Sequence, residues 1–112
     1  MTSEDDPLLA ALSGLRGEYL ADAPGKMREL WQALERVGNG EPGAAAALRA
    51  LAHGLAGSGG AYGFPVITEH ARAVEQAMDR LGLRRPGASE HDQLRAHLQA
   101  IGDAFDQARS PE

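Results

Sequence analysis

The stretch from Leu48 to Gly63, LRALAHGLAGSGGAYG, sets one histidine among small residues in a segment that otherwise has the pattern of a helix. At about 100° per residue, Leu48, Leu51 and Leu55 fall on one side of a helix and form an apolar stripe of the kind that faces a core. His53 lies about 165° from the centre of that stripe. We therefore expect His53 to face solvent or a partner.

Several glycines leave two interpretations of this stretch open. They are Gly54, Gly57, Gly59 and Gly60. Each costs a helix interior about 1 kcal/mol relative to alanine, so helix stability alone does not explain them. In one interpretation the helix ends near Gly57 and a flexible loop follows. In the other it continues to about Tyr62 and packs closely, which suits the apolar side chains at the end of the stretch.

Helical spacing on both sides of this stretch predicts further helices, over about residues 7–21, 23–37, 65–81 and from 89 onward. The first would bury Leu8, Leu12, Leu15 and Tyr19. The first two form either separate helices or one bent helix, because proline both begins and kinks helices. The last would start with Ser89 as its cap and Asp92 as the reciprocal residue.

The expected fold class is all-α. Valine, isoleucine and aromatic residues are sparse and do not alternate over a useful length, so no strand is predicted. We expect an antiparallel four-helix bundle with an additional N-terminal helix packed alongside it or over one end. A chain of 112 residues suits a single domain over 1–112, with flexible tails at 1–6 and 109–112.

Composition excludes several classes of function. The net charge of −5 argues against a nucleic-acid surface, and the lack of cysteine excludes disulfides, thiolate catalysis and the commonest zinc sites. No apolar run approaches the roughly 20 residues that cross a bilayer, and the acidic start MTSEDDP is unlike a secretion signal. We therefore expect a monomeric cytoplasmic protein that binds neither nucleic acid, membrane nor metal.

The other candidate side chains have structural explanations. His70 and His97 lie on or beside apolar stripes and are expected to be partly buried, hydrogen-bonded packing residues. His91, in the first turn of a helix, is expected to be solvated. Glu69 and Glu75 are six residues apart, a poor spacing for one helix face, so both are expected to be solvated surface residues.

The spacing of His53, Leu55, Gly57 and Gly63 resembles the signature of the histidine-containing phosphotransfer (HPt) domain family. That signature is a histidine, any residue, leucine, lysine, glycine and a second glycine six positions on. The segments LRGEYLADAPGKMRELWQAL and ITEHARAVEQA are similar to the flanking helices of such domains. The resemblance therefore covers nearly the whole chain.

One position departs from the family pattern, because Ala56 stands where the signature has lysine. In the family that lysine lies one turn from the histidine, and its positive charge helps to hold the phosphoryl group. We hypothesise that Arg49, on the preceding turn of the same face, supplies this charge instead. A guanidinium can bind two phosphate oxygens at once.

The resemblance implies that His53 is a phosphoacceptor, modified at the ring nitrogen farther from the backbone, while the other nitrogen makes a stabilising hydrogen bond. It also implies a response-regulator receiver domain as partner and a sensor histidine kinase upstream. The chain would be a phosphocarrier without kinase or phosphatase activity of its own. It would bind no cofactor stably, and Mg²⁺ would come from the receiver during transfer.

Small residues around His53 have expected roles in such a site. Gly57 would admit the phosphoryl group and the loops of the receiver, and Gly63 would allow close turn or helix packing beneath the site. Ser58 would either hydrogen-bond the backbone or line the phosphoryl site.

Two alternative functions remain open. Ala56 is the best evidence for a degenerate HPt-like helical adaptor that binds a receiver or kinase without carrying phosphate. An unrelated helical adaptor with a chance motif is the weaker alternative, because the resemblance extends through the flanking helices.

Overall fold

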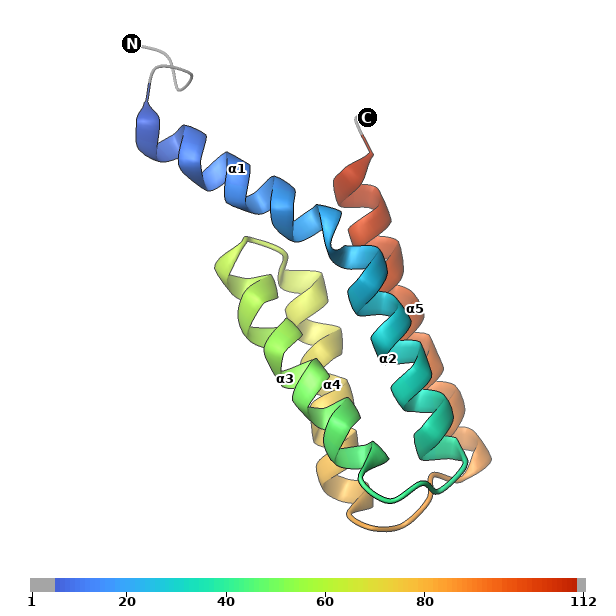
Figure 1. Cartoon of the computed structure of the whole chain (residues 1–112). Helices are drawn as coiled ribbons and strands as arrows, with labels where there is room; N and C mark the ends of the chain where they lie inside the picture. Colours follow the sequence, from blue (N-terminus) through green and yellow to red (C-terminus); the bar gives the residue numbers. More distant parts are fainter. Residues whose placement is uncertain (1–5, 111–112) are drawn as a thin grey trace.

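The computed structural model describes residues 6–110, which form five α-helices joined by short connections (Figure 1). They are α1 (Pro7–Ala21), α2 (Ala23–Gly38), α3 (Ala44–Ala61), α4 (Pro65–Leu81) and α5 (Ala88–Arg109). Helices α2 to α5 form an antiparallel bundle, and α1 leaves one end of it at an angle (Figure 1). Residues 6–110 contain no strand, so the all-α prediction is confirmed. None of these five helices is long and apolar enough to span a membrane.

The core of the bundle combines one apolar face from each of its four helices. The largest fully buried side chains are Leu30, Leu34, Leu48, Ile67, Val74, Leu94, Leu98, Ile101 and Phe105. They recur at the spacings of three and four residues that mark one side of a helix. Burying each such side chain contributes about 1.5–3 kcal/mol, so this common core holds the helix that carries His53 in place.

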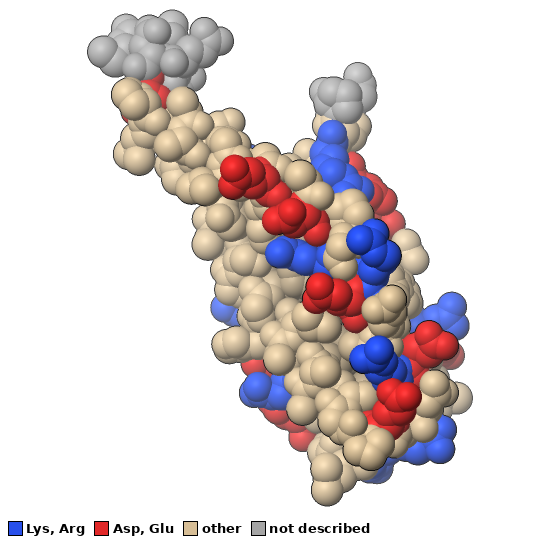
Figure 2. Space-filling model, in the orientation of Figure 1, with Lys and Arg blue, Asp and Glu red and all other residues tan. Residues whose placement is uncertain are grey.

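The leucines of α1 lie outside this core. Leu8, Leu12 and Leu15 share one helix face with Tyr19, yet only Tyr19 is buried and the leucines are between 47% and 67% exposed. The prediction that all four are buried is wrong because α1 runs past the end of the bundle (Figure 1). Periodicity identifies a common face and not what that face meets. Figure 2 shows that the surface of α1 is largely uncharged, whereas charges of both signs are interspersed over the bundle.

Tyr19 attaches α1 to the bundle. Its ring stacks on Tyr62 with the centroids 4.6 Å apart, and it also contacts Phe64 and Phe105 at 6.0 and 5.7 Å. Its Oη lies 2.9 Å from Ser58 Oγ on α3. Burial raises the pKa of Tyr19, so the phenol remains protonated and able to donate this hydrogen bond.

The glycine-rich end of α3 is helical. Because α3 continues to Ala61, the interpretation as a continuous helix is confirmed and the loop from about Gly57 is wrong. Gly54 and Gly57 face open space, since a Cβ placed on either would meet no atom within 4 Å. Gly59 instead faces α4.

Helices α3 and α4 approach each other closely at Gly59. A Cβ on this residue would lie 2.8 Å from Thr68 Oγ1 and 3.1 Å from Ile67 Cγ2, distances that require a neighbour to move. Thr68 Oγ1 also donates a hydrogen bond to the carbonyl oxygen of Ala56 at 2.7 Å. The turn between the two helices contains Gly63 at φ +84°, a conformation that residues with side chains rarely adopt.

The start of α5 differs from the prediction. Gly87 is its N-cap, and the Gly87 N–H donates to Glu90 Oε1 at 2.9 Å. The predicted cap of Ser89 with Asp92 is therefore wrong, because the glutamate three residues after Gly87 takes the reciprocal position. Arg84 donates to both carboxylate oxygens of Glu90 at 2.8 Å, and these bonds, with the Gly87 bond, lower the pKa of Glu90 to about 2.

Two positions assigned to the tails belong to helices. Asp6 caps α1, with its Oδ1 accepting from the Leu8 and Leu9 amides at 2.9 and 3.4 Å. Arg109 is the last residue of α5. Ser110 is the C-cap of α5, and the other residues of the predicted tails, 1–5 and 111–112, lie outside the described residues.

We predict that Gly59→Ala destabilises the protein by about 1–3 kcal/mol, because the added methyl forces α3 and α4 apart. Gly54→Ala is the matched control. It adds the same methyl into open space and should stabilise the helix by up to about 1 kcal/mol. Urea denaturation followed by circular dichroism measures both. Equal stabilisation by the two substitutions would show that the helices do not approach closely at Gly59.

Candidate functional site

His53 projects from the middle of α3, on the side opposite the buried leucines. Its side chain is 73% exposed, whereas Leu48 and Leu55 are buried. The predicted orientation of the helix is therefore confirmed. One edge of the ring is nevertheless held, because Nδ1 lies 2.9 Å from Oε2 of Glu75 on α4.

This hydrogen bond determines which ring nitrogen carries the proton. An ionised carboxylate can only accept, so Nδ1–H of His53 is the donor and Glu75 the acceptor. In a neutral imidazole the other nitrogen, Nε2, then has a free lone pair. The arrangement presents a nucleophilic nitrogen from a rigid helix.

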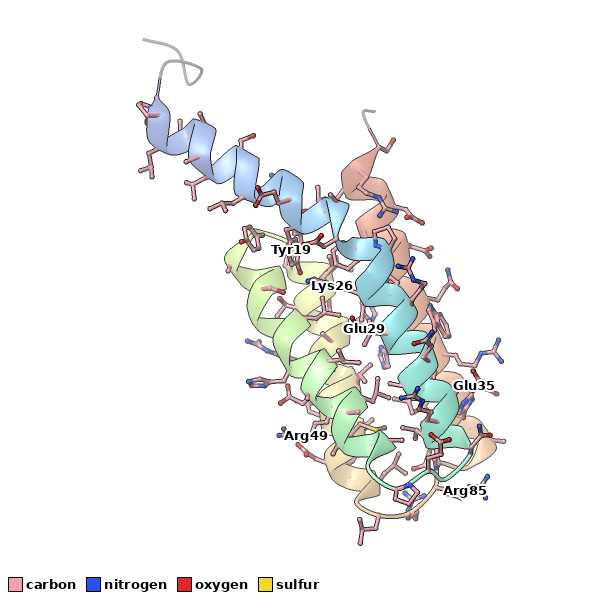
Figure 3. All side chains as sticks on the ribbon, in the orientation of Figure 1. Tyr19, Lys26, Glu29, Glu35, Arg49 and Arg85 are labelled. Carbon is pink, nitrogen blue, oxygen red and sulfur yellow. The ribbon has the colours of Figure 1, made fainter. Side chains whose placement is uncertain are left out.

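Arg49 and Asp79 extend the contact between His53 and Glu75 into a charged cluster. Arg49 Nη2 lies 3.4 Å from the same Glu75 oxygen, and Arg49 Nε lies 2.6 Å from Asp79 Oδ1. The hydrogen bond to Asp79 raises the pKa of Arg49, so the guanidinium stays charged. Arg49 lies on the outer side of α3 (Figure 3). Exposed ion pairs are worth at most about 1 kcal/mol, so this cluster acts by orienting groups more than by stabilising the fold.

The register of the α3–α4 hairpin brings these residues together. His53 and Glu75 lie eleven residues before and after Phe64, and Arg49 and Asp79 lie fifteen residues before and after it. In antiparallel helices of equal rise, residues equally far from the turn lie opposite each other. The expectation that Glu75 is a solvated surface residue is wrong. Pairing the residues of the two helices by their distance in sequence from the turn would have identified Glu75 as the partner of His53.

The surface beside His53 is open on one side. Gly54 and Gly57 face open space, as the role proposed for Gly57 requires. Ala56, in contrast, is only 6% exposed. Ala56, which stands where the family signature has lysine, lies in the packed interface with α4. This position therefore offers no group to a ligand.

A comparison with family models matches residues 14–104 to the Hpt domain. The chain belongs to the Hpt domain family. Membership implies histidine phosphotransfer in two-component signalling, and Hpt domains are phosphocarriers that interact with receiver domains and histidine kinases. Comparisons with curated proteins and with solved structures gave no significant match.

The other two residues predicted for the site of this Hpt domain, Ser58 and Gly63, lie in the last turn of α3 and in the connection that follows it. Ser58 is half-buried, and its hydroxyl pairs with Tyr19 on α1, where we had expected a backbone partner or the phosphoryl site. Gly63 forms the turn that sets the hairpin register, which is the turn role expected for it, and Gly59 provides the close approach of the two helices. The structure thus brings together His53, Arg49 and Gly57 of the predicted set.

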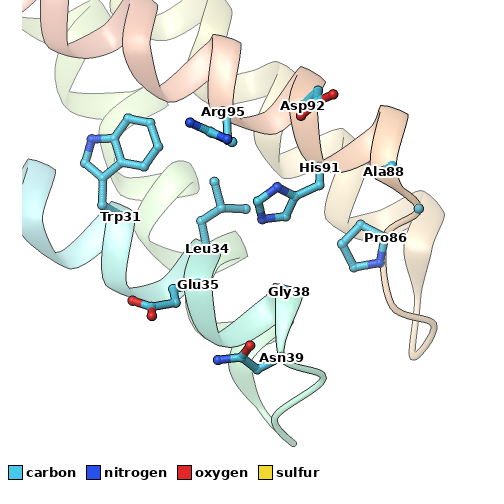
Figure 4. A pocket seen from close by; sticks show the side chains of 11 residues that line it. Trp31, Leu34, Glu35, Gly38, Asn39, Pro86, Ala88, His91, Asp92 and Arg95 are labelled. Atoms are coloured by element: carbon cyan, nitrogen blue, oxygen red, sulfur yellow. The ribbon is translucent and has the colours of Figure 1, made fainter.

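A groove of about 750 Å³ between α2 and α5 is lined by His91, Trp31 and Arg95, among others (Figure 4). None of its lining residues comes from α3 or α4, so it is separate from the His53 site. His91 is half-buried and lies near Gly38. The expectation that it is solvated is wrong, because α2 covers the first turn of α5.

We predict that neutral His53 is protonated at Nδ1. ¹⁵N chemical shifts of its ring, measured at pH 8, should show this tautomer in the wild type. Glu75→Ala should raise the share of the Nε2–H tautomer several-fold, because the charged acceptor that favours Nδ1–H is lost. Glu69→Ala, which removes a different carboxylate from α4, is the control. Identical tautomer ratios in all three proteins would show that Glu75 does not orient the ring.

Proposed function

We propose that this Hpt domain is a phosphorelay intermediate that carries a phosphoryl group on Nε2 of His53. The group would pass between receiver aspartates or arrive through a histidine kinase pathway. The observation that carries the proposal is an exposed histidine whose Nδ1–H is bound by Glu75. We infer a carrier without kinase or phosphatase activity of its own.

The transfer step follows from this tautomer. The Nε2 lone pair attacks the phosphorus of an aspartyl phosphate, an N–P bond forms, and the P–O bond to the aspartate breaks. The aspartate leaves as a carboxylate with the bonding electron pair. The phosphorylated ring keeps its Nδ1 proton and gains positive charge, which the carboxylate of Glu75 stabilises.

The partner would supply the remaining requirements of the reaction. Phosphoryl transfer depends on in-line positioning and charge neutralisation, so a carrier can leave Mg²⁺ to the receiver. The open surface at Gly54 and Gly57 gives the receiver access to His53. Incoming phosphate and receiver would meet small residues here and not bulky side chains.

Arg49 would provide positive charge in place of the missing lysine. The Arg49 guanidinium and the His53 ring both contact Oε2 of Glu75, so this carboxylate oxygen bridges the two side chains. It offsets the negative charge of Glu75, which would otherwise repel an incoming phosphate. Its partners Glu75 and Asp79 hold it by exposed contacts that are weak enough to exchange for phosphate oxygens.

A second candidate function is that of a degenerate adaptor, which would bind a receiver or kinase without accepting phosphate. Ala56 favours it, because this buried alanine replaces the residue that holds phosphate in the family signature. The two functions differ in one observable, the appearance of phosphohistidine.

We predict that incubation with Mg²⁺ and receiver domains of the same organism, ³²P-labelled on aspartate, places acid-labile, alkali-stable label on the wild type. His53→Gln should remain unlabelled, because amide nitrogen is not a nucleophile. His91→Gln, in the groove between α2 and α5, should be labelled normally. Receiver binding without label would favour the adaptor, and label that persists in His53→Gln would exclude His53 as the carrier.

We predict that Arg49→Ala slows transfer or shortens the lifetime of phosphohistidine roughly fivefold, a modest effect because an exposed charged contact is screened by solvent. Arg49→Lys should recover part of the loss. Arg95→Ala, which removes the same charge from the opposite side of the bundle, is the control for net charge. Wild-type kinetics in Arg49→Ala would mean that Arg49 does not replace the missing lysine.

A further inference from the structure

A pair of histidines lies between α4 and α5, apart from the His53 site. Nδ1 of His70 and Nδ1 of His97 are 2.9 Å apart, and the ring centroids are 5.2 Å apart. Both side chains are half-buried. The expectation of partly buried, hydrogen-bonded residues is confirmed for each, but their mutual contact was not foreseen. The phosphotransfer chemistry uses neither residue.

The contact places two basic nitrogens at one point. A hydrogen bond between neutral imidazoles needs a proton on one Nδ1 and a lone pair on the other. Within residues 6–110, neither ring is hydrogen-bonded to a carboxylate that would fix its orientation. A neutral imidazole is a good ligand for Cu²⁺, Ni²⁺ and Zn²⁺.

The spacing of the two nitrogens matches that of adjacent ligands on a metal. With metal–nitrogen bonds of about 2.0 Å, two ligands at 90° are about 2.8 Å apart, and tetrahedral ligands are about 3.3 Å apart. The separation of the His70 and His97 nitrogens, 2.9 Å, is close to the shorter of these distances. An angle of 90° is typical of the tetragonal geometry that Cu²⁺ and Ni²⁺ prefer.

We propose that His70 and His97 are the two protein ligands of a Cu²⁺ site that links α4 to α5. The same site would bind Ni²⁺ more weakly. The ion replaces the proton of the hydrogen bond between the two Nδ1 atoms, and it lies to one side of the line that joins them, at bonding distance from both. The displaced proton moves to Nε2 of its own ring, so binding releases no net proton. Water completes the coordination, since no group of three or more His, Cys, Asp or Glu within residues 6–110 is placed to hold a metal.

The surroundings of the pair suit a hydrated cation. His97 borders a cavity of about 160 Å³ between α4 and α5, together with Gln76 and Gln93. At about 30 Å³ per water molecule, this space accommodates coordinated water. The negative charge of Glu69 acts on His97 and would offset part of the charge of the ion. Arg80 and Glu90, which carry opposite charges, also line this cavity.

We predict that the full chain binds one Cu²⁺, titrated as the free ion in a weakly coordinating buffer and followed by calorimetry. Electron paramagnetic resonance should show coupling to imidazole nitrogen. His70→Gln and His97→Gln should each weaken binding at least tenfold, while the matched control His91→Gln should not. Cu²⁺ should also raise the melting temperature of the wild type, because it links two helices.

A second measurement uses the wild type alone, so its result does not depend on whether the variants fold. Cu²⁺ is paramagnetic, so substoichiometric amounts should broaden the NMR signals of His70 and His97 before those of His53 and His91. Broadening that begins at His53 or His91, or equal affinity in His97→Gln and His91→Gln, would overturn the proposal. Binding only at millimolar Cu²⁺ would also overturn it, and the two histidines would then be a packing contact joined by a hydrogen bond.

Discussion

The close contact between α3 and α4 is the constraint on which the site depends. Gly59 lets the helices approach to a distance at which a methyl group would collide with Thr68, and the Thr68 hydroxyl ties the two backbones together at Ala56. The turn at Gly63 centres the hairpin on Phe64. Pairing of residues equally far from this centre then places Glu75 against His53. A wider or shifted hairpin would retain the histidine but lose its hydrogen-bond acceptor.

The charged cluster on this hairpin suits the phosphoryl transfer that we propose for His53. Glu75 holds the Nδ1 proton, so the nucleophilic lone pair is on the exposed nitrogen, and the carboxylate would also stabilise the charge that the ring gains in the proposed transfer. Arg49 moderates the repulsion between this carboxylate and phosphate. Because these contacts are largely exposed, each is weak and screened by salt. Weak contacts favour a carrier, which must release its cargo as readily as it accepts it.

The sequence predicted the helices, the all-α bundle and the exposure of His53, because helical periodicity reports which residues share a face. It did not show what each face meets. The leucines of α1 form the expected stripe, but the direction in which α1 leaves the bundle decides their exposure. Glu75 looked unpaired because residues six apart on α4 do not share a face, whereas its partner is on another helix. Finding that partner required the hairpin register, which depends on the turn at Gly63 and the packing at Gly59.

The rate of phosphoryl transfer to His53 in Glu75→Ala tests the central claim most directly. Rapid-quench kinetics with a phosphorylated receiver should show a loss of at least roughly fivefold, because the ring loses the acceptor that sets its tautomer and stabilises its charge. Glu69→Ala should transfer at the wild-type rate. Wild-type transfer in a folded Glu75→Ala protein would contradict the account, since the α3–α4 register would then have no part in making His53 a phosphoryl carrier.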